Sequence, residues 1–370
     1  MQFNSNNSNQ IVMRQHHWKD IEMNNTISTP CTSHTQKVLH VESGAELLKL
    51  IKSDSQLAQA DVIRLVEKAN GFYAAIPFRD LLDASMLIKQ GKQCHLMFTG
   101  RAKLSYIFEA DQLKNLNQVL EFLSYSLQDL TIAAMNSNST SCTHNAYAGL
   151  IVLGELTVAG EHQNFPLTSS ALRRKVITEQ LDFLPFTLFN SARRNPLDGS
   201  YQNLIKWNSG MSFEQQAASP LGTLDLIMLE YSETTLRAVL RQRHWEGFVL
   251  YDSSSSFIPS KRTSRVAALK FPVFIPAQVT SFAYNYTTRG RIITQVTCCT
   301  AETVLPDGTT LPSKRVILGS GIDDLMRSKL EAGFRVDLLI KCEHVNRDGN
   351  LIKPVIAGKT YIDEAKASGQ

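Results

Sequence analysis

The sequence lacks the cysteine patterns of a metal site or of a disulfide framework. Its six cysteines are scattered, without a CxxC pair and without a histidine at zinc-finger spacing. Neither a structural zinc nor a disulfide-stapled fold is indicated, and a reducing compartment is the simpler expectation. The six are Cys31, Cys94, Cys142, Cys298, Cys299 and Cys342.

Long apolar runs and a targeting signal are missing too. No stretch approaches the roughly 20 apolar residues that span a bilayer, and the N-terminus has no charged segment followed by an apolar run. We therefore expect a protein that has no membrane contact, is not secreted and resides in the cytoplasm.

The glycine-rich loops of the common nucleotide-binding folds are also absent. No GxGxxG or GxxxxGK[ST] motif follows a strand-like run. Strand-like runs alternate with helical stretches without βαβ regularity, which argues against a doubly wound fold. If this chain binds a nucleotide, it uses other means.

What is present is enough chain for two domains, since 370 residues with 43% hydrophobic content can bury a substantial core. Residues 1–37 are polar, rich in Asn, Ser, Gln, His and Thr, and predict a flexible arm. Residues 38–272 predict an α+β domain of mixed antiparallel sheets and helices, beginning with an amphipathic helix at 44–52. Strand-like runs occur at 72–78, 95–98, 150–158, 183–189, 224–229, 247–251 and 266–271.

Residues 273–370 have a different composition, rich in Thr and Val. Two hairpin signals, Pro306-Asp-Gly308 and Arg347-Asp-Gly349, flank a short helix expected at 321–330. Strands, one helix and further strands over about ninety residues predict a small five-stranded OB-type barrel.

Positive charge is locally clustered, although the formal net charge is only +4. A net charge this small does not prove a nucleic-acid partner, and each cluster taken alone is equally well a solvated face. The clusters are Arg173 to Lys175; Arg237, Arg241 and Arg243; Lys261, Arg262 and Arg265; and Arg289 with Arg291.

A KxxG motif, Lys68-Ala-Asn-Gly71, lies between an expected helical run and the strand at 72–78. Alone it is weak, because Lys366 begins a second match near the C-terminus. Position separates the two. Only Lys68 is followed by Glu155 in a Gly-Glu-Leu run, by Glu246 in Glu-Gly-Phe-Val-Leu-Tyr, and by Lys270 in Ala-Leu-Lys-Phe-Pro.

This ordered set, from Glu67 to Gly358, resembles the covalent nucleotidyltransferase superfamily of DNA ligases, RNA ligases and mRNA capping enzymes. The tail Gly319-Ser-Gly-Ile-Asp-Asp324, with the residues that follow it, looks like the OB domain of ATP-dependent DNA ligases. The resemblance implies a nucleotidyltransferase (adenylation) domain over 38–272 and an OB-fold domain over 273–370.

The resemblance also implies roles for individual residues. Lys68 is expected to attack the α-phosphate of ATP, and Lys270 to act as a second cation that also contacts the transferred phosphate. Glu155 is expected to contact the ribose, and Glu246 to help hold a divalent metal, Mg²⁺ or Mn²⁺. Phe189 matches the position of an aromatic ring that stacks on the purine.

Further residues are assigned more loosely. Glu67, directly before the lysine, and Arg101 are expected near the nucleotide, where an arginine can grip phosphate. Sequence-independent contacts to nucleic-acid phosphates are expected from Lys261, Arg262, Arg265, Arg289 and Arg291.

Each assignment has an ordinary structural alternative. On the KxxG motif alone, Lys68 is better explained as a solvated lysine that ends a helix, whereas the downstream residues favour the nucleophile. Glu155 is alternatively an edge-strand residue that points to water. Glu246 is alternatively a charge that opens a surface strand, and Phe189 an ordinary core residue.

Two departures from the ligase pattern bear on the substrate and on the first step. Asn70 and Tyr73 stand where DNA ligases have Asp and Arg in KxDGxR, and Glu67 is closer to the RNA-ligase style. The C-terminal RxDK signature is missing, because the end of the resemblance reads Gly358-Lys-Thr-Tyr-Ile-Asp363.

The resulting expectation is a monomeric ATP-dependent ligase that seals nicked duplex DNA through a lysyl-AMP intermediate, located where its nucleic acid is found. RNA or hybrid duplexes are alternative substrates. A GTP-dependent capping guanylyltransferase, and a nucleic-acid-binding homologue that has lost adenylation, are alternative functions.

Overall fold

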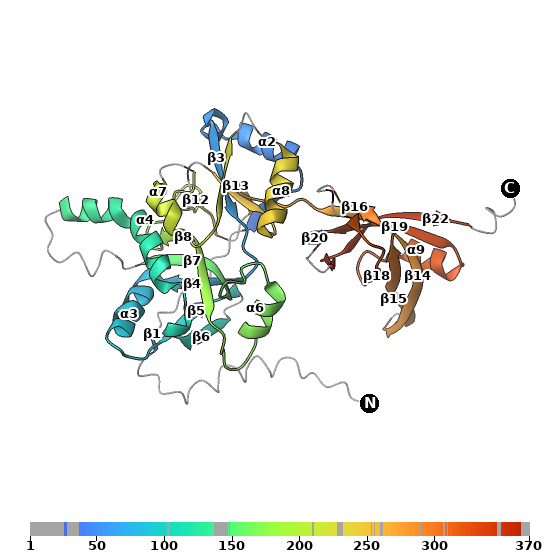
Figure 1. Cartoon of the computed structure of the whole chain (residues 1–370), viewed down its shortest axis with the longest axis horizontal. Coiled ribbons are helices and arrows are strands. Elements are labelled where there is room, and N and C mark those ends of the chain that lie inside the picture. Colours follow the sequence, from blue (N-terminus) through green and yellow to red (C-terminus); the bar gives the residue numbers. More distant parts are fainter. Residues whose placement is uncertain are drawn as a thin grey trace. The chain divides into compact units, whose positions relative to one another are not determined.

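The computed structural model divides the chain into two compact units, and Figure 1 labels its elements. Unit 1 comprises Met1–Leu39, Arg64–Asp225 and Tyr251–Val266, and unit 2 comprises His40–Ile63, Leu226–Leu250 and Ala267–Gln370. The structure describes residues 26–27, 37–101, 104–136, 147, 149–208, 211–227, 232–252, 254, 256–259, 262–288, 290–305, 308, 310–345 and 349–363.

Unit 1 is built on a mainly antiparallel sheet of order β1-β5-β4-β7-β8, in which β6 also pairs with β5 and β1 is parallel to β5. Its strands are β1 (Thr26–Ile27), β4 (Phe72–Pro77), β5 (His95–Thr99), β6 (Ser105–Glu109), β7 (Leu150–Val158) and β8 (Leu181–Asn190). Its helices are α3 (Phe78–Lys89), α4 (Leu116–Asn136), α6 (Phe165–Leu172), α7 (Phe213–Ala218) and the 3-10 turn η5 (Ala110–Gln112). In Figure 1, α3 and α6 lie to the left and right of these strands.

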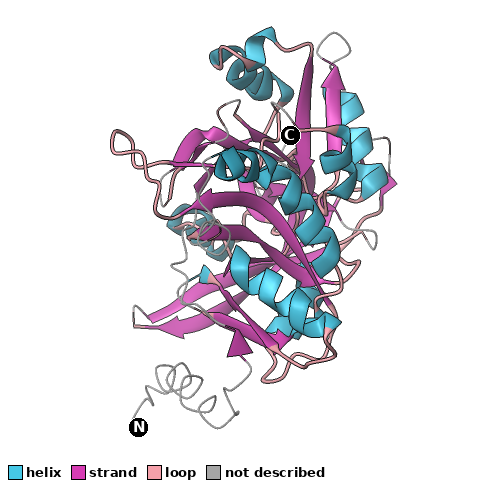
Figure 2. Ribbon diagram, turned by 90° about the vertical axis from the view of Figure 1, so that its left-hand side faces the viewer, coloured by secondary structure: helices cyan, strands magenta, loops and turns pink. Residues whose placement is uncertain are grey.

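The apolar runs of β7 and β8 explain this arrangement. Strand β7 pairs with β4 on one side and with β8 on the other, and most of the side chains of both β7 and β8 are buried. Helices α3 and α6 contact β7, and α4 contacts β8; Figure 2 shows helices packed beside strands. A strand that has a neighbour on each side and is covered on its faces needs a continuous run of apolar residues.

A second five-stranded sheet has the order β10-β3-β11-β13-β2. Its strands are β10 (Thr223–Ile227), β3 (Val62–Glu67), β11 (Phe248–Tyr251), β13 (Arg262–Leu269) and β2 (Lys37–Val41). In unit 1, the short strands β9 (Tyr201–Gln202) and β12 (Ser256–Phe257) form an antiparallel pair.

Unit 2 contains two amphipathic helices, α2 (Gly44–Ser53) and α8 (Glu233–Arg243), and the 3-10 turn η3 (Leu57–Gln59). The side chain of Ser43 caps α2 by accepting the amide of Glu46. The amide of Gly44 donates to the Glu233 carboxylate at 2.7 Å, which connects the beginnings of the two helices.

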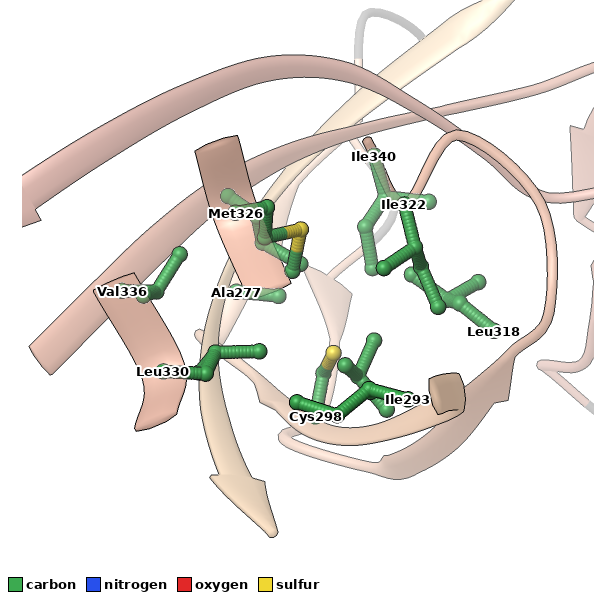
Figure 3. Close-up of a cluster of buried hydrophobic side chains, with 11 residues drawn as sticks. Ala277, Ile293, Cys298, Leu318, Ile322, Met326, Leu330, Val336 and Ile340 are labelled. Carbon is green, nitrogen blue, oxygen red and sulfur yellow. The ribbon is translucent and has the colours of Figure 1, made fainter. Parts of the chain in front are cut away.

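The C-terminal part of unit 2 is an antiparallel sheet of order β18-β15-β14-β19-β22 with one helix, α9 (Asp324–Glu331). Figure 3 shows Met326 and Leu330 of α9 directed at the buried side chains of the sheet, including Cys298. The strands are β14 (Val273–Thr287), β15 (Gly290–Thr300), β18 (Arg315–Leu318), β19 (Arg335–Cys342) and β22 (Val355–Ile362). Two small hairpins accompany it, β16 (Thr303–Val304) with β17 (Thr310–Leu311), and β20 (His344–Val345) with β21 (Leu351–Ile352).

The mixed α+β architecture with several sheets agrees with the prediction, as do the two hairpins and the helix at 44–52, observed as α2. The helix expected at 321–330 is α9, which begins at Asp324. The strand expected at 266–271 starts earlier, at Arg262, and the one expected at 224–229 is described as Thr223–Ile227. The closed OB barrel and the domain boundary at residue 272 stay predictions.

The helical run expected before Lys68 is wrong, because Val62–Glu67 is strand β3. Apolar residues at 62, 63, 65 and 66 suit either period, and three of these four are β-branched, which favours a strand. The polar arm lies outside the described residues, except for Thr26–Ile27 and Lys37. Among the helices that the structure describes, none has the length and apolar content needed to cross a membrane.

Candidate active site

Lys68 lies on the short loop that joins β3 to β4 in unit 1. Its side chain is half-buried, and its ammonium group lies 3.4 Å from the carbonyl oxygen of Ala69. The alternative of a solvated lysine at a helix end is therefore wrong, since a strand precedes the residue and neighbouring atoms cover part of it. The residues from Lys68 to Gly71 are called the Lys68 loop below.

Glu155 holds the far end of the Lys68 loop. Its Oε2 atom accepts the amide of Gly71 at 2.7 Å, and Glu155 lies opposite Tyr73 in the β4–β7 pairing. A Cβ atom on Gly71 would lie 2.5 Å from the carbonyl oxygen of Leu156, so only glycine fits there. Because β7 is an interior strand and this side chain is half-buried, the alternative of an edge-strand glutamate in water is wrong.

The charge of Glu155 is also felt by Tyr251, which is buried in unit 1. Burial, and to a lesser extent the nearby Glu155 carboxylate, raise the pKa of the Tyr251 hydroxyl well above its ordinary value. This hydroxyl therefore stays protonated under physiological conditions.

Glu67 holds the near end of the Lys68 loop. The residue is 6% exposed, and its carboxylate accepts the side-chain amide of Gln163 at 2.8 Å and the backbone amide of Gly222 at 3.0 Å. The same Gln163 amide donates to the carbonyl oxygen of Lys68 at 3.0 Å. Glu67 thus fixes the chain directly before the nucleophile candidate, and its expected place near a nucleotide stays a prediction.

Three residues near this loop were not identified from the sequence: His162, Gln163 and Asp182. The carbonyl oxygen of His162 accepts the amide of Asn70 at 3.0 Å, and the His162 ring lies 3.1 Å from the Asp182 carboxylate. His162 and Gln163 lie in a polar turn that follows the strand of Glu155, and this place was the only signal in the sequence; Asp182 lies on β8.

The His162–Asp182 pair shifts both pKa values. Burial disfavours the imidazolium, but the hydrogen bond to Asp182 and the charges of Glu67, Asp182 and Glu161 outweigh it and raise the pKa of His162. Burial likewise opposes ionisation of Asp182, but hydrogen bonds from His162 and from the Gly160 amide lower the pKa of its carboxyl group.

Arg101 and Phe189 also belong to unit 1. Arg101 is exposed, and its guanidinium carbon lies 5.8 Å from the centroid of the Tyr73 ring. Phe189 is fully buried, with ring centroids 4.8 Å from Tyr201 and 5.1 Å from Phe257. This packing is that of an ordinary core phenylalanine, and its purine-stacking role stays a prediction.

In unit 2, Lys270 and Glu246 form a buried ion pair. The ammonium nitrogen of Lys270 lies 2.5 Å from Oε1 of Glu246 and 3.0 Å from Oε2 of Glu343. The side chains of Lys270 and Glu246 are only 13% and 1% exposed, so the alternative of a surface charge at a strand opening is wrong for Glu246. Burial alone lowers the pKa of Lys270, but the two carboxylates outweigh it and the net shift is upward. Lys270 is therefore a fixed cation.

The predicted nucleic-acid contacts are only partly described. Lys261, Arg289 and the side chain of Arg262 lie outside the described residues. Arg265 is half-buried and pairs with Asp198 at 3.3 Å and Asp252 at 3.9 Å. The exposed Arg291 places its guanidinium carbon 3.8 Å from the centroid of the Tyr284 ring. Contact of any of these with nucleic acid stays a prediction.

No protein-family model and no curated protein matches the chain. Solved structures similar to it include a Lig E DNA ligase (14% identity, TM-score 0.48, covering 89% of this chain and 100% of that chain). The ATP-dependent DNA ligase of bacteriophage T7 in complex with ATP has 12% identity and a TM-score of 0.37, with 88% and 98% covered. The Chlorella virus DNA ligase-adenylate has 14% identity and a TM-score of 0.31, with 90% and 100% covered. At such identities, the roles of individual residues have to be argued from this chain's own geometry.

Proposed function

We propose that the chain is an ATP-dependent polynucleotide ligase that works through a lysyl-AMP intermediate on Lys68. The observation that carries the proposal is that hydrogen bonds fix the Lys68 loop at both of its ends. A half-buried lysine is presented between two strands, with Glu155 bonded to the Gly71 amide at one end and Glu67 fixed at the other. A nucleophile has to be held in place to react efficiently, and this loop is held at both ends.

The proposed reaction has three steps. The neutral amine of Lys68 attacks the α-phosphorus of ATP, forming a P–N bond as the P–O bond to pyrophosphate breaks and the amine loses a proton. A 5′-phosphate oxygen then displaces the lysine, which leaves AMP on the strand end. Finally the adjacent 3′-hydroxyl attacks that 5′-phosphorus, loses its proton and releases AMP.

Lys270 supports this chemistry as a permanent positive charge. A buried, protonated ammonium offsets negative charge that develops on a phosphate far better than a solvated one, because little water screens it. Unlike a freely rotating surface lysine, it is oriented by Glu246 and Glu343. We assign it the stabilisation of the transferred phosphate.

The divalent metal fits as an ion that arrives with the nucleotide. The described residues contain no group of three or more His, Cys, Asp or Glu side chains that could hold a metal by themselves. Mg²⁺ commonly takes one or two carboxylates and completes its shell with water and phosphate oxygens, so Glu246 could supply one oxygen. Bound there, Mg²⁺ or Mn²⁺ would neutralise phosphate charge.

Covalent labelling tests the central claim. The full chain is incubated with α-labelled ATP or GTP and run on a denaturing gel, beside Lys68→Ala and the control Lys366→Ala, which removes the other KxxG lysine. We expect label from ATP in the wild type and in Lys366→Ala, and none in Lys68→Ala. A labelled Lys68→Ala band would place the nucleophile elsewhere, and label from GTP alone would favour a capping guanylyltransferase.

The strand that is joined is proposed to be DNA, because the Gly319 to Asp324 segment resembles DNA ligases. Sealing of nicked DNA, nicked RNA and hybrid duplexes by the same preparation decides between them. A second candidate function, nucleic-acid binding without adenylation, is favoured by Asn70, Tyr73 and the missing RxDK signature. Binding to nicked duplex without any labelled band would support it.

A further inference from the structure

The turn that follows β7 contacts the Lys68 loop at two backbone positions. The Gln163 side-chain amide donates to the carbonyl oxygen of Lys68, and the carbonyl oxygen of His162 accepts the amide of Asn70. Gln163 also donates to the buried carboxylate of Glu67. Two backbone groups that directly follow the Lys68 side chain, and the side chain of Glu67 before it, are therefore tied to two consecutive residues of this turn.

Asp182 of β8 holds this turn in place. Its Oδ2 atom accepts the amide of Gly160 at 2.8 Å and lies 3.1 Å from Nε2 of His162. Asp182 is 7% exposed, so its position is set by the core of unit 1. A chain of hydrogen bonds thus connects β8, through Asp182 and the turn, to the Lys68 loop.

We propose that residues 160–163 form a brace that positions the Lys68 loop, with Gln163 as its positioning residue and the His162–Asp182 pair making its hold dependent on pH. This inference rests on the proposed function for its kinetic consequence, but the brace itself can be measured without any activity. Neither Gln163 nor His162 is assigned contact with a substrate.

The direction of the pH dependence follows from the charges that face His162. These are Asp182 from β8, Glu67 from β3 and the adjacent Glu161, while Lys114 acts on Asp182. A raised histidine pKa means that the ion pair is fully present below the ordinary pKa of 6.5 and is lost as the pH rises through the higher folded value. Asp182, whose pKa is lowered, stays ionised throughout the neutral range. The brace is therefore tightest below about pH 6.5 and loosens as the pH rises through the higher pKa of His162 in the folded protein.

Amide hydrogen exchange tests the brace directly. In the wild type, the Asn70 and Gly71 amides are expected to be protected, and Gln163→Ala should speed their exchange at least tenfold. Gln112→Ala is the matched control, because Gln112 also donates a part-buried amide to a backbone carbonyl, that of Ile177 at 2.9 Å. Unchanged exchange at Asn70 and Gly71 in Gln163→Ala would overturn the brace whether or not the chain is a ligase.

The kinetic readout separates positioning from loss of folded protein. At saturating ATP, Gln163→Ala should lower the rate constant of adduct formation by about tenfold to a hundredfold, because a misplaced nucleophile reacts slowly. The ATP concentration for half-maximal rate and the final labelled fraction should match those of Gln112→Ala. A loss confined to the labelled fraction would mean a merely structural role and would refute the proposal. If the wild type forms no adduct, the proposed function fails while the exchange experiment still decides on the brace.

His162→Gln tests the pH dependence, since glutamine keeps a hydrogen-bonding side chain and removes the titrating charge. The ratio of wild-type to His162→Gln protection at Asn70 should be larger at pH 6 than at pH 9. A ratio that is flat over this range would show that the His162–Asp182 pair does not control the brace.

Discussion

Replacing Gly71 by alanine should damage the Lys68 loop, because the added methyl group has no room. Its Cβ atom would lie 2.5 Å from the carbonyl oxygen of Leu156, 2.7 Å from Cγ2 of Thr157 and 3.2 Å from Cβ of Glu155. Two of these atoms are backbone or Cβ atoms of β7, which cannot rotate away. The loop or the β4–β7 pairing has to shift.

The magnitude can be worked out from two contributions. Forcing an extra methyl group into a packed site costs about 1–3 kcal/mol. Moving the Gly71 amide away from Glu155 weakens a hydrogen bond to a charged group, worth about 1.5–3 kcal/mol. The two are not strictly additive, so we expect Gly71→Ala to lower the free energy of unfolding of unit 1 by at least about 2 kcal/mol. In a unit of this size, that corresponds to a fall of about 4–8 °C in the unfolding temperature.

Gly319→Ala provides the matched control. Its backbone is not in the left-handed region, and the nearest atom to an added Cβ would be the carbonyl oxygen of Thr294 at 3.8 Å. The same substitution there should be neutral, or stabilising by about 0.4–1 kcal/mol through the unfolded state. Urea unfolding followed by circular dichroism compares the two variants. If Gly71→Ala unfolded at the same urea concentration as Gly319→Ala, the close approach of β7 would be refuted.

Two further substitutions test the buried polar groups. Lys270→Met leaves the buried carboxylate of Glu246 uncompensated, and it should lower the free energy of unfolding, measured with urea at pH 7, by about 3–5 kcal/mol. The control Lys341→Met breaks a half-exposed pair and should lower it by about 1 kcal/mol or less. Since the pKa of Lys270 is raised, its contribution should persist up to strongly alkaline pH, and a loss already at pH 8 would contradict the pairing. Thr157→Val should raise the free energy of unfolding by about 1 kcal/mol. Among the described residues, the Thr157 hydroxyl is the buried side-chain oxygen without a hydrogen-bond partner. A variant less stable than the wild type would show that this hydroxyl does have a hydrogen-bond partner.

Much of unit 1 could be predicted because its elements have unambiguous apolar patterns. Strand β7 is a run of apolar residues bounded by polar residues, and its length of nine residues suits a strand. Strand β3 could not be predicted, since its six residues carry apolar positions that suit both periods. The tertiary pairing with neighbouring strands decides such a case, and a single sequence does not contain it.

The candidate site divides along the same line. Lys68, Glu155 and Lys270 were found because each stands in a short run whose order along the chain resembles a known family. His162 and Asp182 were missed because their relation is a contact between a turn and β8, twenty residues apart, and neither residue belongs to a motif. Spacing along a chain predicts contacts within a helix or strand, but not contacts between a turn and a strand.

The hold on the Lys68 loop explains why the run around Glu155 accompanies the weak KxxG motif. Glu155 lies on β7 and bonds to Gly71, while Gln163 lies in the turn just beyond β7 and bonds to the carbonyl oxygen of Lys68. One continuous stretch of nine residues thus grips the loop at both ends. A carboxylate can accept about four hydrogen bonds, so the bond from Gly71 leaves Glu155 able to accept one from a ribose hydroxyl as well. In the proposed ligase, the same side chain would both hold the Lys68 loop and contact the ribose of the nucleotide that Lys68 attacks.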